Sequence, residues 1–221
     1  MDNCTPSSID RHVGEVLLKL GSSGAPQYVL VAPESYGSVD ECLDAVSEKI
    51  RRDGGNIVFG WCIWKTPMIT EAEFHAVWKS PSGDLIDVTP KEPPEQRILF
   101  VTHDRNLWLD VANVDNVRIN NTGSPLVDDF ILVNEAIFAI ANKGDRSQHL
   151  KKFLSRKEAS LLENLRMAKV SLQFFYEEGG HPGSACYCGS GKKYYECHSK
   201  NLLSLLSHLG EIGVILRRTN D

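Results

Sequence analysis

The sequence of 221 residues lacks long hydrophobic runs, although 42% of its residues are hydrophobic. It has no run of about eighteen apolar residues, the length that a membrane-spanning helix requires. The stretch from Met1 to Pro6 also lacks the basic region followed by an apolar region that marks a secretory signal. We therefore expect a soluble, cytoplasmic protein that does not act in a membrane.

The chain also lacks long basic runs, since no run of lysines exceeds two. Residues 1–149 hold 13 basic and 22 acidic side chains, a net charge of −9, whereas residues 150–221 hold 11 and 7, a net charge of +4. Nucleic acid binding draws on clustered cations, so the acidic part argues against it. The basic part either touches an acidic surface or is the solvated face of a helix. We expect a protein partner or a peptide substrate, and the sequence indicates no particular oligomeric state.

Alternating side chains predict two strands joined by a tight turn at residues 71–88. Apolar residues alternate with mostly polar ones from Glu71 to Trp78, and a β-branched run resumes after Leu85. Between them, Pro81-Ser82-Gly83 supplies turn residues. A hairpin in this register brings His75 close to the strand that carries Asp87.

Cys42 follows residues that predict the start of a helix. A thiol attacks as its thiolate, which a neighbouring imidazole and the positive end of a helix dipole both favour. In a Cys42, His75 and Asp87 set, His75 holds the proton and Asp87 fixes the tautomer of the imidazole. The Cys42 amide can supply half of an oxyanion hole. The other donor is not singled out, although Gln27 and Tyr36 lie upstream of the thiol.

The region from Val39 to Pro90 resembles the transglutaminase-like members of the papain-like superfamily. Its runs His75-Ala76-Val77-Trp78 and Asp87-Val88-Thr89-Pro90, with a glycine between them, are similar to the family's His-Ala-Trp, Gly and Asp-Pro-Thr signature. The resemblance implies an α+β fold in which a helix that begins with the cysteine packs on an antiparallel sheet. It also implies a cysteine-dependent hydrolase or acyl transferase acting on an amide or peptide bond. Its nucleophile would be Cys42, its general acid and base His75, and its orienting group Asp87.

Two carboxylates directly before Cys42 favour a different function. The negative charges of Asp40 and Glu41 oppose formation of a thiolate. In that interpretation Cys42 is a small buried hydrophobic residue, and His75 is a core histidine with satisfied hydrogen bonds. The alternative function is therefore a non-catalytic, zinc-containing adaptor built on an inactive papain-like fold.

Helix signals dominate the second half of the chain. Ser124-Pro125 is a serine N-cap followed by proline at the first helical position, and Ser155 opens a capping box before a long amphipathic pattern. Strands therefore gather in the first half and helices in the second, which favours an α+β domain. We expect a papain-like domain at residues 1–149, a connecting helix at 150–180, and a zinc motif with a terminal helix at 181–221.

The most specific pattern of the chain is a cluster of metal-binding residue types near its end. Three thiolates and one imidazole, the soft donor set that zinc prefers, come from Cys186, Cys188, Cys197 and His198. Gly189 and Gly191 allow the tight turn that brings them together. The other interpretation, a disulfide pair, leaves the position of the histidine and the glycines unexplained. We therefore expect one Zn²⁺ ion.

The segment Cys188-Gly189-Ser190-Gly191-Lys192-Lys193-Tyr194 resembles the core of the SEC-C zinc motif, known from the tail of the bacterial translocation ATPase SecA. The closed ligand set implies a structural rather than a catalytic metal. Zinc binding would then provide folding free energy to a segment too short to fold alone. The resemblance also implies docking on a protein partner, for which the matching exposed residues are Lys192, Lys193, Tyr194 and Tyr195.

Overall fold

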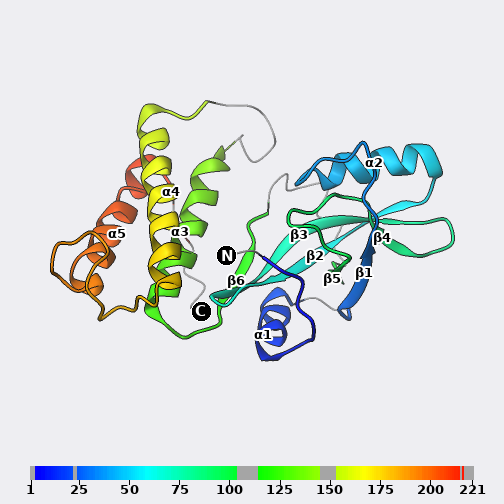
Figure 1. Ribbon diagram of the computed structural model, residues 1–221. Helices are drawn as coiled ribbons and strands as arrows, with labels where there is room; N and C mark the ends of the chain where they lie inside the picture. The colour runs from blue at the N-terminus through cyan, green and yellow to red at the C-terminus, as the bar shows by residue number, and fades with distance from the viewer. Residues whose placement is uncertain (1–2, 22–23, 104–113, 145–152, 215, 217–221) are drawn as a thin grey trace. The chain divides into compact units, whose positions relative to one another are not determined.

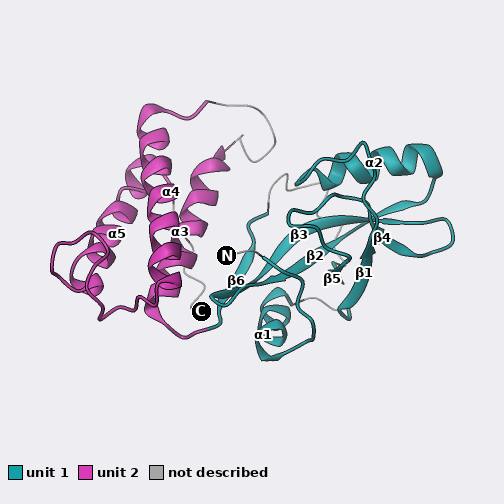
Figure 2. Ribbon diagram, in the orientation of Figure 1, with its two compact units in different colours: residues 1–109, 114–121 teal, residues 110–113, 122–221 magenta. Residues whose placement is uncertain are grey.

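The structure is a computed structural model that describes residues 3–21, 24–103, 114–144, 153–214 and 216. Its described residues form two compact units, which divide between Asn121 and Thr122 (Figure 2). The first unit carries every strand of the described chain, and the second unit is helical. This division places the helix at Pro125–Ala141 in the second unit, whereas the sequence pattern groups it with the first.

The first unit is a barrel of strands with helices outside it (Figure 1). Five strands close into a ring in the order β2-β5-β1-β4-β3, because β3 pairs back onto β2, and β6 extends the sheet beside β3. The pairing of β1 with β4 is parallel and the other pairings are antiparallel. The elements are α1 (Arg11–Leu20), β1 (Gln27–Val31), α2 (Cys42–Asp53), β2 (Asn56–Lys65), β3 (Ile69–Lys79), β4 (Leu85–Asp87), β5 (Arg97–Thr102) and β6 (Val117–Asn120).

The closed barrel corrects the expected fold. The sequence predicted a papain-like core in which the Cys42 helix packs on an antiparallel sheet, and this part of the prediction is wrong, although α+β holds in broad terms. The reason is that β2 is apolar on both faces and β3 is buried along most of its length, so both faces of these strands need cover. Closure is completed by the parallel pairing of Leu30 with Ile86, which are far apart in the sequence and leave no local pattern.

Side chains from four strands fill the barrel interior, among them Val31, Cys62, Trp64, Val77 and Phe100. On the outside, α1 packs on one part of the barrel and α2 on another.

Gly60 on β2 allows β5 to approach closely, since a Cβ atom at this position would lie 2.2 Å from the carbonyl oxygen of Val101. A side chain at Gly60 would therefore force the ring of strands to shift.

The second unit packs three α-helices together: α3 (Pro125–Ala141), α4 (Arg156–Glu177) and α5 (His198–Ser207). Two short 3₁₀ turns, η3 (Tyr194–Glu196) and η4 (Gly210–Ile212), flank α5. The capping box that the sequence predicted at the start of α4 is confirmed, because Ser155 and Glu158 each accept a hydrogen bond from the other's backbone amide. In the part of the chain that the structure describes, no helix has both the length and the apolar character needed to cross a membrane.

Candidate functional site

A pocket of about 170 Å³ in the first unit is lined by both Cys42 and His75. Cys42 is the first residue of α2 and is partly buried, whereas His75 lies on β3 and is 6% exposed. The Cys42 thiol is among the groups that raise the pKa of the His75 ring, and both side chains face this pocket. Behind the ring, Asp87 Oδ2 lies 3.1 Å from His75 Nε2 and is fully buried. The structure thus brings the three predicted residues together in the order thiol, imidazole, carboxylate.

The strand register positions the imidazole and the carboxylate. β3 pairs with β4 so that Trp78 lies opposite Ile86, which sets Asp87 on the strand beside that of His75. Because side chains alternate along a strand, His75 shares its face with Val77, which packs in the barrel interior. Both polar groups therefore point to the inside of the barrel near one end.

The loop before α2 brings the thiol to the same end of the barrel. Ala32 donates a backbone hydrogen bond of 2.8 Å to the carbonyl of Asp87, and Glu34 donates one of 3.1 Å to the carbonyl of Val88. This pairing continues β1 alongside the chain that follows β4. The first turn of α2, with Cys42, is thereby held close to the segment that follows Asp87, and α2 packs on Val88.

Asp87 is held by three hydrogen bonds. Its Oδ2 accepts from His75 Nε2 and from Lys91 Nζ, which is 2.7 Å away, and its Oδ1 accepts from the Thr89 amide at 3.0 Å. Because Nε2 donates to Asp87, the ring nitrogen left to face the thiol is Nδ1. Lys91 Nζ also lies 3.4 Å from His75 Nε2, but that nitrogen has no lone pair to offer in this tautomer. The sequence did not predict Lys91, since no motif marks it.

The two buried groups hold opposite charges. Burial lowers the pKa of His75, but the hydrogen bonds with Asp87 and Cys42 and the charge of Asp87 outweigh it and raise the pKa to about 9. Burial raises the pKa of Asp87, but the hydrogen bond and charge of His75 and the charge of Lys91 lower it to about 2. At neutral pH the ring is therefore an imidazolium, which stabilises a thiolate beside it.

Carboxylates dominate the charge of the pocket wall. Asp40, Glu73 and Glu92 line it, and none of them pairs with a cation among the residues described. The lysine of the pocket, Lys91, is paired with Asp87. Asp40 also has a φ of 66°, an uncommon backbone conformation for a residue other than glycine, two positions before the thiol. The pocket therefore favours a neutral or cationic ligand over an anionic one.

The four predicted metal ligands lie together in the second unit, with donor atoms within 4.8 Å of one another: Cys186, Cys188, Cys197 and His198. The two sulfurs of Cys188 and Cys197 are 3.7 Å apart, and Cys197 Sγ is 3.5 Å from His198 Nδ1. Zinc with Zn–S bonds of about 2.3 Å at tetrahedral angles has S···S separations of about 3.8 Å. The cluster can therefore bind a metal ion and is compatible with zinc. The three cysteines are free thiols, not members of a disulfide.

The turn that forms the cluster, which we call the knuckle (residues 184–198), is anchored on the helices of its own unit. Gly189 and Gly191 have φ values of 72° and 73°, which the tight turn needs. Tyr194 is 1% exposed, and its hydroxyl donates a hydrogen bond of 2.7 Å to Asp129 of α3. Its ring also packs against Phe175 of α4. The expectation that Tyr194 is an exposed docking residue is therefore wrong, because its ring and its hydroxyl both anchor the turn.

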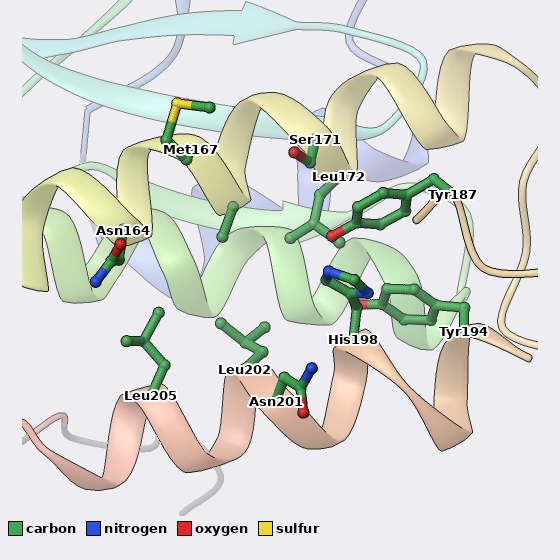
Figure 3. Close-up of a pocket in the computed structure, with 11 residues that line it drawn as sticks. Asn164, Met167, Ser171, Leu172, Tyr187, Tyr194, His198, Asn201, Leu202 and Leu205 are labelled. Atoms are coloured by element: carbon green, nitrogen blue, oxygen red, sulfur yellow. The ribbon is translucent and has the colours of Figure 1, made fainter. Parts of the chain in front are cut away.

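A groove of about 340 Å³ lies beside the metal cluster, between α4 and α5 (Figure 3). The ring of His198 faces it, and Tyr187 lies against this ring with 4.3 Å between centroids. The other walls are largely apolar, with Met167, Leu172, Leu202 and Leu205.

No protein-family model, no curated protein and no solved structure matches this chain.

Proposed function

We propose that the first unit is a cysteine-dependent hydrolase or acyl transferase that acts on an amide or peptide bond. The observation that carries this proposal is the thiol of Cys42, at the start of a helix, in one pocket with a buried His75 that is itself held by Asp87. A nucleophile, a base that activates it and a group that orients the base are the three parts that acyl transfer through a cysteine requires.

The reaction would proceed in two steps through a thioester. The thiolate of Cys42 attacks the carbonyl carbon, the carbon–sulfur bond forms, and the π electrons move to the oxygen. When the carbonyl re-forms, the bond to the leaving amine breaks and His75 Nδ1–H gives that amine its proton. Water or a second amine then loses a proton to His75 and displaces Cys42. The carboxylates of the pocket wall favour neutral or basic acyl donors.

In the second unit, the proposed metal is a structural Zn²⁺ held by the three thiolates and the imidazole. Supporting this, the donor set matches the chemistry of zinc, and the surrounding sequence is similar to the SEC-C core. Four protein ligands leave no open position for a substrate, so the ion would stabilise the knuckle. The groove beside it would bind a protein partner or recruit the substrate.

Pre-steady-state kinetics with p-nitrophenyl acetate tests the proposed enzyme. We expect a burst of p-nitrophenol close to one equivalent per chain, because the ester acylates Cys42 faster than the thioester hydrolyses. The Cys42→Ala variant should show no burst, and the Cys4→Ser variant, which lacks an exposed cysteine that does not line the pocket, should retain it. A wild-type protein without a burst, or a burst that survives in Cys42→Ala, would count against the enzyme.

The second candidate function is a non-catalytic adaptor, now on a barrel scaffold. It is favoured by the exposed carboxylates of Asp40 and Glu41 next to the thiol and by the apolar groove of the second unit. The same burst experiment separates the two functions, since an adaptor has no reason to accumulate an acylated Cys42.

A further inference from the structure

Thr89 has a buried hydroxyl group without a hydrogen-bond partner among the described residues. The residue is 1% exposed, and it lines the pocket that contains Cys42 and His75. Folding removes such a hydroxyl from water without replacing its hydrogen bonds, which costs free energy. A ligand in the pocket that accepts a hydrogen bond from the hydroxyl would remove this cost.

A hydrogen bond holds Thr89 beside the carboxylate that orients His75. Thr89 follows the end of β4 by two residues, and its amide donates a hydrogen bond of 3.0 Å to Asp87 Oδ1, while Asp87 Oδ2 accepts from His75. Counted three residues on from the Trp78–Ile86 pair along each segment, Thr89 corresponds in position to His75 of β3. The loop before α2 runs along Asp87 and Val88, so the first turn of α2 lies at the same end of the barrel.

We propose that the Thr89 hydroxyl is the second donor of the oxyanion hole, with the Cys42 backbone amide as the first. The inference rests on the proposed acyl-transfer function. When the thiolate lone pair forms the carbon–sulfur bond, the carbonyl π pair becomes a third lone pair on oxygen, and the Thr89 O–H and Cys42 N–H donate to it. Both donors release it when the leaving-group bond breaks. Gln27 and Tyr36, the upstream candidates, do not line the pocket.

Stability and activity should respond to Thr89→Val in opposite ways. Valine has nearly the same shape as threonine but no hydroxyl, so it removes a buried group that lacks a partner. The melting temperature should therefore stay the same or rise. Acylation should fall, because the transition state loses a hydrogen bond that the resting protein never makes.

Two electrophiles separate the hydroxyl's role from the reactivity of the thiol. p-Nitrophenyl acetate passes through an oxyanion, whereas iodoacetamide alkylates sulfur at a CH₂ group and forms no oxyanion. Thr89→Val should slow acylation of Cys42 by about 100-fold or more and leave its alkylation rate unchanged. Thr89→Ser keeps the hydroxyl and should restore most of the acylation rate. Tyr36→Phe is the matched control, since it removes another buried hydroxyl without a partner, outside the pocket, and should leave acylation unchanged.

Each outcome decides the inference. If the Thr89→Val variant is acylated at the wild-type rate, the Thr89 hydroxyl is not an oxyanion donor, while the proposed function stands. A Thr89→Val that fails to fold also overturns the inference, because the hydroxyl would then be structural. A wild-type Cys42 that reacts with neither electrophile refutes the proposed function itself, and this inference with it.

Discussion

A His75→Gln variant should acylate Cys42 about 100-fold or more slowly than the wild type at pH 6. Hydrogen bonds with Asp87 and Cys42 hold the pKa of His75 at about 9, so the wild-type ring is an imidazolium at pH 6 and stabilises a thiolate. Glutamine carries no charge, and it cannot return a proton to the leaving group. The measurement is the burst rate with p-nitrophenyl acetate from pH 5 to 10. His12→Gln, on α1 and outside the pocket, should behave as wild type.

The ratio of the wild-type acylation rate to that of His75→Gln should fall as pH rises. In the variant the rate should rise steeply with pH until an ordinary thiol is ionised near pH 8.5. In the wild type the positive charge of His75 is present below about pH 9, so the rate advantage over the variant should shrink as pH rises through about 9 and His75 loses its proton. A constant ratio of the two rates across this range would show that His75 does not act through its charge.

The contribution of His75 to the free energy of unfolding should also depend on its protonation. A pKa raised on folding from the ordinary value of 6.5 means that the contribution of His75 is complete below about pH 6.5 and is lost as pH rises through about 9. The difference in urea midpoint between wild type and His75→Gln should therefore narrow between these pH values. This readout needs no substrate and therefore supports the charge assignment independently of any activity.

Removing the metal should unfold the knuckle and leave the barrel intact. The turn at residues 184–198 is short, and apparent zinc-binding free energies of roughly 10–16 kcal/mol would make a bound zinc its main source of stability. Tyr187 and Tyr194, which pack with Phe175, should lose their fixed environment. Hydrogen exchange after chelation should speed up in the knuckle and stay slow in β2 and β3.

The Cys188→Ser variant tests the same site by removing one of the four proposed metal ligands. We expect about one zinc per chain in the wild type and in Cys4→Ser, whose cysteine lies far from the cluster in sequence, and a much lower content in Cys188→Ser. Equal zinc contents in all three proteins would contradict the ligand assignment. The burst should survive in Cys188→Ser, since the metal has no part in the proposed acyl transfer.

Local patterns were enough to anticipate the parts of the site that neighbouring residues determine. The alternation on β3 and the turn after it set the register that joins His75 to Asp87. The start of α2 at Cys42 follows from helix-start residues. The metal cluster follows from ligand spacing within one short segment.

The features of the fold and of the site that the sequence did not predict depend on contacts between distant segments. Barrel closure needs β1 beside β4, and no residue of either strand encodes that partner. Lys91 and Thr89 join the site through hydrogen bonds to Asp87, which spacing does not reveal. The sequence predicted Tyr194 as a docking residue, but its hydroxyl donates a hydrogen bond to Asp129, which makes burial of the Tyr194 side chain favourable.

The most direct test of a nucleophilic Cys42 is the rate at which iodoacetamide labels Cys42 and Cys4 in the same wild-type sample at pH 6, read by peptide mass spectrometry. Cys4 is exposed and does not line the pocket, so it serves as an internal reference thiol. We expect Cys42, although partly buried, to be labelled at least about tenfold faster, because the imidazolium charge of His75 lies beside its sulfur. Faster labelling of Cys4 than of Cys42 would contradict a nucleophilic Cys42.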